Sequence, residues 1–435
     1  MKRFKIRNPY ATVAAFLGDP AHHYKTNLHT HSTVSDGTAD YADMIKGHYY
    51  EGFDILAMTD HGIIGRPWNQ KPAELPLYYF QYLVGNKKTP LTDEEFAAIT
   101  DGTYPAPEGA RTPGRGMHCL CPAIERNMVT WTKSHVNGFF VTRGEGDWGK
   151  ENGFLYAVKD IADEGGVSFI NHPGDWLEST HHPENATKPE NVRFFGDIFV
   201  NYPSCVGTEI FNYNGHDTKN DRLLWDALLR YVIPHGRSVW GFANSDAHKL
   251  NQIDTSFMDF ILPQDYSDAV MRTAMESGTF FAQSRYAVNE LGEGFHAEGP
   301  LPRVTALTAD EDAQTVSVTA ENASKIQWIA DGKVLAEASA EGGTVASTFS
   351  LTDHADNISC YVRFQVLGKG GITASQAITL DDGALESLII KDPRSVVQKV
   401  TDEREFARKS TRLYILRQET ARSRARKKAR KAAGK

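Results

Sequence analysis

Two histidines and an aspartate stand close together in the stretch NLHTHSTVSDG, residues 27–37. One residue separates His29 from His31, and Asp36 follows five residues after the second histidine. Alternate residues of a strand point to the same side, so the two imidazoles can bind one ion together. The alternative is a turn in which the three side chains satisfy one another.

Further apolar runs carry the same residue types at their ends. In FDILAMTDHG, GMHCLCPAIER, GGVSFINHPG and SVWGFANSDAH, these are Asp60 and His61, Glu125, His172, and Asp246 and His248. One such residue alone is ordinarily structural or solvated, but their joint placement favours a shared site. Mixed imidazole and carboxylate ligands suit Zn, Mn or Fe better than Ca or Mg. The candidates outnumber the ligands of one ion, which predicts a multinuclear centre.

These residues must be positioned by strands that alternate with helices. From residue 24 to about 285, the apolar runs are followed by amphipathic stretches such as GFLYAVKDIADEGG, which reach a glycine where a helix would end. The alternation predicts an α/β fold with parallel strand pairing, either a barrel or a doubly wound sheet. In both architectures the loops after the carboxyl ends of the strands form the active face.

Changes of pattern divide the chain into an N-terminal segment at residues 1–23, an α/β unit at 24–290, an all-β unit at 300–382 and a tail at 395–435. The all-β unit alternates apolar and polar residues between Gly, Asn and Asp turns, which predicts a small immunoglobulin-like β-sandwich. The tail is basic and helix-forming. Residues 65–115 interrupt the α/β pattern and are rich in Pro, Gly and aromatic residues. They are either a lid over the active face or a solvent-side excursion.

Charge is unevenly distributed along the chain. The net charge is −8, but residues 392–435 carry 15 Lys and Arg against 5 Asp and Glu, so residues 1–391 have a net charge of −18. An acidic body argues against general nucleic-acid binding and is compatible with a site that collects cations. For the basic tail, a solvated end is favoured over contact with anionic lipid or RNA.

The cysteines and apolar runs predict a cytoplasmic protein. The four cysteines, Cys119, Cys121, Cys205 and Cys360, form no CxxC pair and no spacing typical of a disulfide framework. No apolar run approaches the length of a membrane span, and the N-terminal MKRFKIRNPYATVAAFLGDP is a poor signal peptide. A reducing cytoplasm is therefore expected.

The ordered motifs HTH, TDHG, PAIE, NHPG and SDAH resemble the polymerase-and-histidinol-phosphatase (PHP) superfamily over roughly residues 24–285. The resemblance implies a distorted barrel of seven β/α units, with three divalent metal ions in a cleft at the strand ends. The segment GTFFAQSRYAVNELG resembles the linker of two-domain members, which implies rigid packing of the two units.

The resemblance also implies three sets of ligands. The first metal would be bound by His29, His31, Asp246 and Glu125. Glu125 would bridge to a second metal, which His135 and His172 would also bind. The third metal would be bound by Asp36, His61 and His248. Asp60 would orient a ligand without binding metal itself.

These features predict a metal-dependent phosphoesterase that acts on a small phosphorylated molecule. Paired ions lower the pKa of water and screen the charge of phosphoryl oxygens. Cationic side chains must hold the other phosphate oxygens, and the candidates are Arg126 and Arg143, with Lys133 and Arg66 in addition. Glu209, Asn212 and His216 either line the cleft or form a hydrogen-bonded rim.

Two other functions stay open on the sequence alone. The same metal centre could hydrolyse a carboxylic ester, an amide or a carbamate, because activated water attacks each of these electrophiles. In the other alternative the chain is a non-catalytic binding or assembly module, with the β-sandwich as its working part. Metal binding by the α/β unit separates the first two functions from the third.

Overall fold

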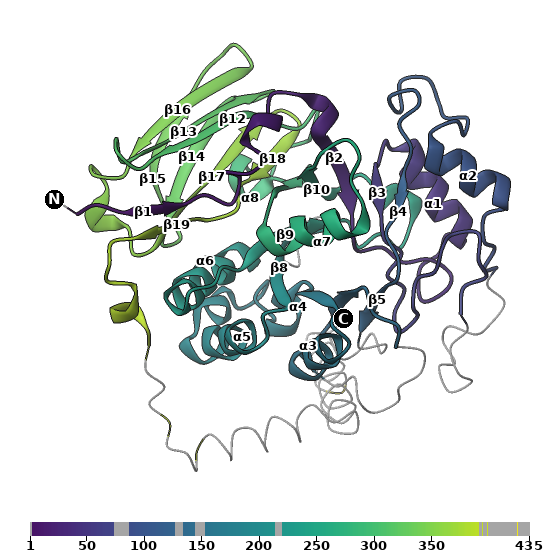
Figure 1. Cartoon of the computed structure of the whole chain (residues 1–435), viewed down its shortest axis with the longest axis horizontal. Coiled ribbons are helices and arrows are strands. Elements are labelled where there is room, and N and C mark those ends of the chain that lie inside the picture. Colours follow the sequence, from purple (N-terminus) through teal and green to yellow (C-terminus); the bar gives the residue numbers. More distant parts are fainter. Residues whose placement is uncertain are drawn as a thin grey trace, which may run out of the picture.

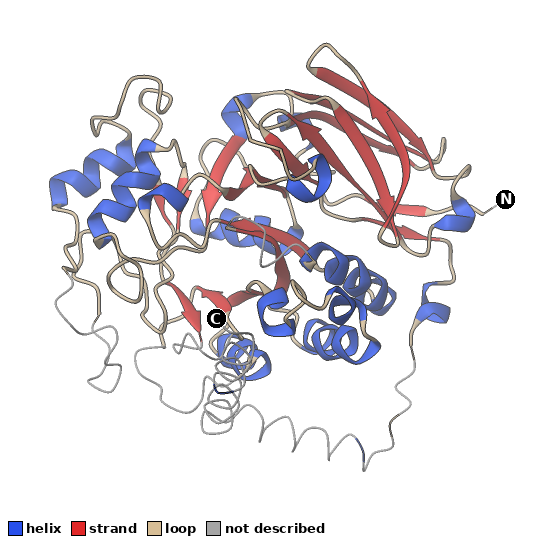
Figure 2. Ribbon diagram, turned by 180° about the vertical axis from the view of Figure 1, so that it is seen from behind, coloured by secondary structure: helices blue, strands red, loops and turns tan. Residues whose placement is uncertain are grey.

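The structure is a computed structural model that describes residues 2–73, 87–126, 134–143, 153–213 and 220–390, and in addition Arg394, Gln398 and Arg424. It is a mixed α/β protein, as the sequence predicts. Figure 1 and Figure 2 show an α/β part that carries the helices and an all-β part beside it. The predicted basic helix at 395–435 lies outside the described residues, apart from Gln398 and Arg424.

One sheet extends from the predicted metal-ligand motifs into the C-terminal part of the chain. Its order is β1-β19-β17-β18-β11-β10-β2-β3-β4, with β14 and β15 joined at β17. The strands at the motif end are β2 (His23–Asn27), β3 (Ile55–Leu56), β4 (His118–Cys119), β10 (Ser256–Ile261) and β11 (Phe280–Ser284). β2, β3 and β4 are parallel, but β10 is antiparallel to β2 and to β11. The predicted parallel pairing is therefore wrong for β10 and β11.

A second sheet carries the other motifs in the order β5-β6-β7-β8-β9. Its strands are β5 (Ala123–Arg126), β6 (Val136–Phe139), β7 (Val167–Ile170), β8 (Cys205–Asn212) and β9 (Trp240–Asn244). β7, β8 and β9 are parallel, whereas β6 is antiparallel to both of its neighbours. Two isolated bridges, Thr30 to Ala247 and His61 to Glu125, join the two sheets. Both bridges lie within the ligand motifs, so the candidate site lies where the sheets meet.

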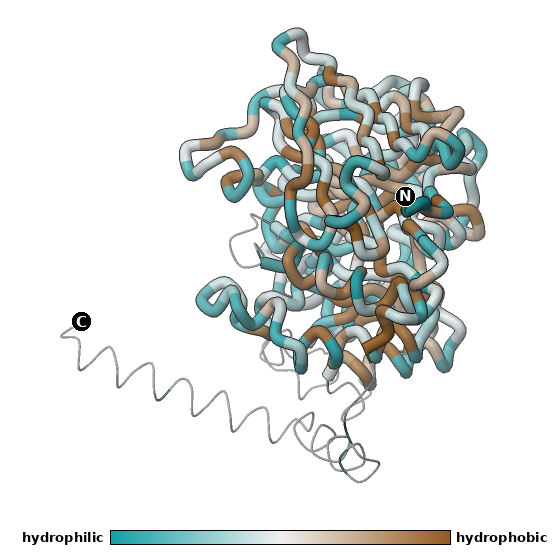
Figure 3. The backbone as a smooth tube through the Cα atoms, turned by 90° about the vertical axis from the view of Figure 1, so that its left-hand side faces the viewer, coloured by the Kyte–Doolittle hydropathy of each residue, from teal (hydrophilic) through white to brown (hydrophobic). Residues whose placement is uncertain are grey.

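Helices pack around these sheets. They are α1 (Tyr41–Tyr50), α2 (Asp93–Asp101), α3 (Phe154–Asp163), α4 (Pro173–Leu177), α5 (Pro189–Asn201), α6 (Asp221–Val232), α7 (Asp268–Ser277) and α8 (Val288–Leu291). Short 3₁₀ helices span Ala14–Phe16, Pro20–His22, Pro183–Thr187, Ile233–His235, Leu250–Gln252, Ala355–Asn357 and Leu385–Leu388. One apolar core unites α3, α5, α6 and α7 with both sheets. Figure 3 shows hydrophobic residues along the inner segments and hydrophilic residues at many outer turns.

The interruption at 65–115 contributes α2, which begins with a capping box between Thr92 and Glu95. Trp68, Leu91 and Ile99 are buried in a separate apolar cluster that also contains residues of α1. The described part of the interruption therefore has a core in common with α1. Residues 74–86 lie outside the described ranges, so the lid role stays a prediction.

The C-terminal part contains two antiparallel layers around one core. One layer is formed by β12 (Arg303–Asp310), β13 (Thr315–Glu321) and β16 (Thr344–Ser350). The other contains β14 (Lys325–Ala330), β15 (Lys333–Ser339), β17 (Tyr361–Gly368), β18 (Gly371–Ala374), β19 (Ile378–Asp381) and β1 (Lys5–Arg7). Trp328 and Phe349 stack between the layers, with ring centroids 5.2 Å apart. β1 pairs with β19, and β18 pairs with β11, so the hydrogen-bonded sheet is continuous between the two parts of the chain.

No helix in the described ranges is both long and apolar enough to cross a lipid bilayer.

Candidate metal centre

The first ligand motif and the last one are hydrogen-bonded to each other through their backbones. The His31 amide donates to the carbonyl of Ala247 at 2.9 Å, and the Asp246 amide donates to the carbonyl of His29 at 3.0 Å. Asp246 has φ of 46° and His172 has φ of 22°. Residues other than glycine rarely adopt such values, which occur in turns and also cluster at functional sites. The backbone at two strand ends is thus constrained where ligand-type side chains must converge.

His29, His31 and Asp246 form a nearly equilateral triangle of ligand atoms. The two Nε2 atoms are 3.2 Å apart, and they lie 3.3 and 3.2 Å from Asp246 Oδ1, respectively. Nitrogen and oxygen ligands bound at ~2.0–2.1 Å in a tetrahedron are separated by about 3.4 Å. The triangle therefore has the dimensions of three ligands around a single ion.

Glu125 lies at the centre of the candidate site and is fully buried. Its carboxylate is approached by five imidazoles. Oε1 lies 3.2 Å from His29 Nε2, 3.1 Å from His135 Nδ1 and 3.7 Å from His172 Nε2, and Oε2 lies 3.1 Å from His31 Nε2 and 2.8 Å from His61 Nδ1. A carboxylate with histidines around both oxygens can bridge two ions.

Asp36 and His248 form the more accessible side of the site. Asp36 Oδ1 lies 3.2 Å from His248 Nε2, and Asp36 Oδ2 lies 3.6 Å from His61 Nε2. The Asp36 and His248 side chains are 27% and 30% exposed, whereas those of His29, His31 and Glu125 are fully buried. Solvent therefore reaches the cluster at Asp36 and His248.

All nine predicted ligands belong to groups compact enough to bind an ion. The groups are His31, Asp36, His61 and His248; His29, Glu125 and His172; His29, His31 and Asp246; and His61, Glu125 and His135. The distribution differs in part from the predicted sets, because His135 groups with His61 whereas His172 groups with His29. The assignment of each ligand to a particular ion stays a prediction.

Several side-chain atoms of the predicted ligand residues are buried and make no hydrogen bond of good geometry within the described structure. These atoms are Glu125 Oε2, Asp246 Oδ1, His61 Nδ1, His135 Nε2 and His172 Nδ1. An unsatisfied buried polar atom ordinarily costs about 1–3 kcal/mol, so five within one site need compensation. Divalent transition-metal ions would supply it, since imidazole and carboxylate are the ligands that such ions bind. The residues therefore fit a metal centre.

The carboxylates and imidazoles shift one another's pKa. Burial favours the neutral acid of Glu125, but the surrounding histidines, His61 foremost, outweigh this and keep its pKa well below the usual range. Burial opposes the imidazolium of His31, yet the adjacent carboxylates of Asp246 and Glu125 outweigh this and raise its pKa to about 10. The same balance raises the pKa of His172 to about 9. Metal ions displace such protons, so their binding releases protons.

Asp60 anchors the loop that carries the first motif. Its Oδ1 accepts hydrogen bonds from the amides of Ser32 and Ser35 at 2.7 and 3.1 Å and from the Ser35 hydroxyl at 2.8 Å. Its Oδ2 accepts from the Ser32 hydroxyl at 2.9 Å. Asp60 belongs to none of the compact ligand groups. These contacts agree with the predicted orienting role, and they act on the loop through Ser32 and Ser35.

Two supporting residues were not identified as such from the sequence. Glu209 accepts a hydrogen bond from His29 Nδ1 at 2.9 Å and is fully buried, so it does not line an open cleft. Asn171 donates to Glu125 Oε1 at 2.7 Å. A charged residue inside the apolar strand VGTEIFN and an amide directly before His172 were the available signals. Neither signal shows which ligand the side chain contacts.

The two arginines predicted to bind phosphate are engaged with α3. Arg126 pairs with Asp160 at 3.2 Å and Glu164 at 3.0 Å, and Arg143 pairs with the same two residues at 3.4 and 3.3 Å. Arg126 is fully buried, whereas the Arg143 side chain is 47% exposed. Their role in substrate binding stays a prediction. Lys133 and His216 lie outside the described residues.

Comparison with known proteins gave structural similarities alone. No protein-family model matches the chain, and no curated protein matches it. A two-domain protein from Bacteroides vulgatus, described as containing a predicted PHP-like metal-dependent phosphoesterase, is 15% identical with a TM-score of 0.41; the alignment covers 82% of this chain and 95% of that one.

Two other solved structures have lower TM-scores against this chain. An amidohydrolase from Chromobacterium violaceum is 15% identical with a TM-score of 0.31, over 57% of this chain and 96% of that one. A lesion-specific endonuclease from Pyrococcus furiosus is 11% identical with a TM-score of 0.31, over 86% and 73% of the two chains. At such scores, function must be inferred from the metal centre itself.

Proposed function

We propose that the protein is a metal-dependent hydrolase of the PHP type, a phosphoesterase acting on a small phosphorylated molecule in the cytoplasm. The observation that supports this most strongly is the buried Glu125, with imidazole nitrogens of five histidines within 3.7 Å of its carboxylate. A further part of the proposal is that residues 24–290 form the distorted seven-unit barrel and that residues 300–382 form the immunoglobulin-like sandwich.

The nine ligand residues would hold up to three divalent ions, with Mn, Zn or Fe as the candidates. Glu125 would be shared between two ions, and Asp36 would belong to the ion nearest the accessible side. When bound, such ions lower the pKa of water toward neutrality and neutralise charge on the oxygens of the scissile group.

The protein's own residues prepare the centre for this chemistry. Glu209 accepts the Nδ1 proton of His29, which leaves the Nε2 lone pair directed at Asp246 and Glu125. Asp60 fixes the loop after His31. A hydrogen bond that sets the tautomer of a ligating histidine also raises its basicity. Ligand orientation is therefore determined before any ion binds.

A second candidate is hydrolysis of a carboxylic ester, amide or carbamate at the same centre. It is favoured by the pairing of Arg126 and Arg143 with Asp160 and Glu164, because phosphate binding by these arginines would compete with α3. A neutral substrate needs no such cationic clamp.

The test is a substrate panel with metal-reconstituted protein. Full-length protein is chelated, reloaded with Mn²⁺, Zn²⁺ or Fe²⁺, and assayed with nucleotides, sugar phosphates, p-nitrophenyl phosphate and p-nitrophenyl acetate. The proposal expects phosphate release that is abolished in His31→Ala and retained in His182→Ala, an exposed histidine away from the site. Cleavage of the acetate alone would establish the second candidate, and no cleavage by metal-loaded protein would favour a binding module.

A further inference from the structure

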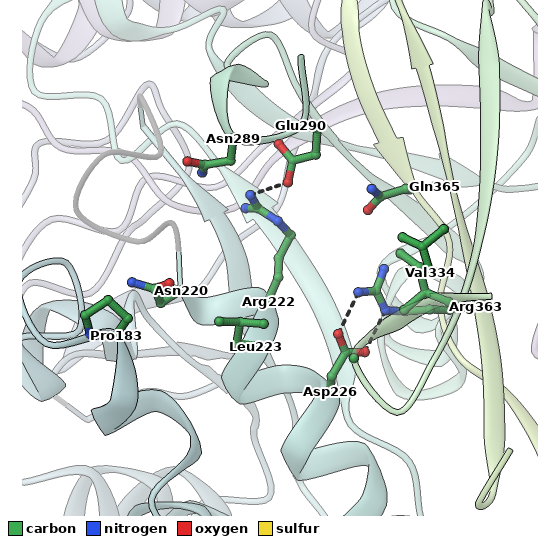
Figure 4. Close-up of a pocket in the computed structure, with 12 residues that line it drawn as sticks. Pro183, Asn220, Arg222, Leu223, Asp226, Asn289, Glu290, Val334, Arg363 and Gln365 are labelled. Atoms are coloured by element: carbon green, nitrogen blue, oxygen red, sulfur yellow. Dashed lines mark hydrogen bonds and ion pairs between the residues drawn. The ribbon is translucent and has the colours of Figure 1, made fainter. Parts of the chain in front are cut away.

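A cavity of 380 Å³ lies between the two parts of the chain, away from the ligand motifs. Its walls come from α6, α8 and the strands β14, β15 and β17 (Figure 4). This volume is within the range of ~300–1,000 Å³ typical of pockets that bind small molecules.

Four charged side chains form its floor, in two ion pairs. Asp226 accepts two hydrogen bonds from Arg363, at 2.8 Å from Nε and 2.7 Å from Nη2. Arg222 Nη2 donates to Glu290 Oε1 at 2.5 Å. The two positive and two negative charges cancel, so the floor attracts neither anions nor cations strongly.

Each ion pair leaves one atom unsatisfied. Arg363 Nη1 and Glu290 Oε2 are buried and have no hydrogen-bond partner in the described part of the structure. The Arg363 side chain is only 4% exposed. In Figure 4, its free nitrogen points away from Asp226, into the space bounded by Arg222, Glu290 and Gln365. Two residues that line the cavity therefore carry an unsatisfied donor and an unsatisfied acceptor, and leaving such groups unpaired is costly.

Part of the rim of the cavity is apolar. Leu223 and Val334 line it and are 41% and 47% exposed, and Ile329 lies beside them. A ligand that suits both regions must present C–H surface to the rim and hydrogen-bonding groups to the floor. Those groups must both accept from Arg363 and donate to Glu290, and hydroxyl groups do both.

We infer that this cavity is a binding site for a small neutral polyhydroxyl compound, such as a monosaccharide or cyclitol. The inference is independent of the metal centre and of the proposed hydrolase activity. It assigns a ligand-binding role to the contact between the α/β part and the all-β part of the chain.

The test is ligand-observed NMR on the full-length protein with D-glucose, D-galactose, D-mannose and myo-inositol as neutral probes. Gluconate and glucosamine serve as negatively and positively charged comparison compounds. We expect at least one neutral probe to bind more tightly than either charged compound. Val334→Trp places a ring in the cavity mouth and should weaken binding about tenfold or more, whereas Leu388→Trp, at a similarly exposed position elsewhere, should not.

Two further variants complete the experiment. His31→Ala should retain binding, which separates this cavity from the metal centre. Arg363→Lys keeps the charge but removes the planar guanidinium. Provided that thermal unfolding shows this variant to be folded, it should bind the neutral probe more weakly than wild type. If the variant does not fold, the result with Val334→Trp decides. The inference is overturned if no neutral probe binds, if a charged counterpart binds better, if Val334→Trp has no effect or if His31→Ala abolishes binding.

Discussion

His29 Nδ1 donates a hydrogen bond of 2.9 Å to Glu209 Oε1, and both side chains are fully buried although 180 residues separate them in sequence. Glu209 also accepts from the His172 amide at 3.1 Å and from the side chains of Asn212 and Asn244 at 2.9 and 2.8 Å. One carboxylate of β8 thus contacts residues from three other segments of the site.

Replacement of Glu209 by Gln should weaken metal binding by about 10–100-fold, the usual effect of losing the partner of a ligating histidine. The neutral amide is a poorer acceptor for His29 Nδ1–H and cannot satisfy all four donors. Competition with a chromophoric chelator measures the affinity. Glu341→Gln, on the exposed surface of the all-β part, is the matched control. Equal metal affinities in wild type and Glu209→Gln would show that Glu209 does not support metal binding through His29.

Asp60→Asn should destabilise the protein by about 2 kcal/mol, because hydrogen bonds to a charged acceptor are replaced by weaker ones. An amide nitrogen would also face the donors of Ser32 or Ser35. Equilibrium denaturation in urea measures the loss, with the exposed Asp353→Asn as control. Since Asp60 positions the loop of His31, metal affinity should fall in the same variant. A variant with wild-type stability and affinity contradicts the anchoring role.

His48 should make stability fall as the pH is lowered. Burial is the main cause that lowers its pKa to about 4, and the side chain bridges Asn27 and the carbonyl of Met44 at 2.8 Å each. The folded pKa lies below the unfolded value of ~6.5, so the unfolded chain binds the extra proton. The stabilisation is fully present above pH ~6.5 and declines by up to about 3 kcal/mol as the pH falls through 4.

The difference in unfolding free energy between wild type and His48→Gln, measured from pH 7 to 4, isolates this effect. The free energy of unfolding of wild type, relative to that of His48→Gln, should fall steadily as the pH is lowered over that range. His182→Gln should leave the pH dependence unchanged, because His182 is exposed. A difference that does not vary with pH would show that His48 is not buried in its neutral form.

The ion pair between Asp226 and Arg363, which connects α6 to β17, should contribute strongly to the free energy of unfolding. Both side chains are more than nine-tenths buried, and Asp226 also accepts from the Tyr361 hydroxyl at 2.7 Å. Asp226→Asn leaves a buried guanidinium without its counter-charge and should cost about 3–5 kcal/mol. The double variant Asp226→Leu, Arg363→Met should recover part of that loss. Urea denaturation of both variants tests this, and an unchanged midpoint in Asp226→Asn contradicts it.

The convergence of most candidate ligands could be predicted from the sequence because they follow short apolar runs, whereas His135 precedes β6 and was expected only from the family resemblance. The residues around them could not. Asp60 was recognisable as a neighbour of His61, but its true contacts are with Ser32 and Ser35, which only the folded loop brings together. Glu209 lies within a buried strand, and its partner comes from another sheet.

Strand direction was the weaker part of the fold prediction. Alternating strands and helices suggested parallel pairing, yet β6 and β10 are antiparallel to their neighbours. Buried strands of both kinds are continuous apolar runs, so hydrophobicity cannot distinguish them. The pairing of β11 with β18 joins residues about 90 positions apart, and no local pattern predicts such a contact.

The most direct test of the proposed metal-dependent hydrolase activity is the rate of substrate hydrolysis by chelated protein as Mn²⁺ is added back in known equivalents. The ligand geometry around Glu125 predicts no hydrolysis in the metal-free protein and a rate that rises to a plateau as the groups around Glu125 fill. His31→Ala should require more metal and should not reach that plateau. Full activity in protein shown to be free of metal would contradict the account.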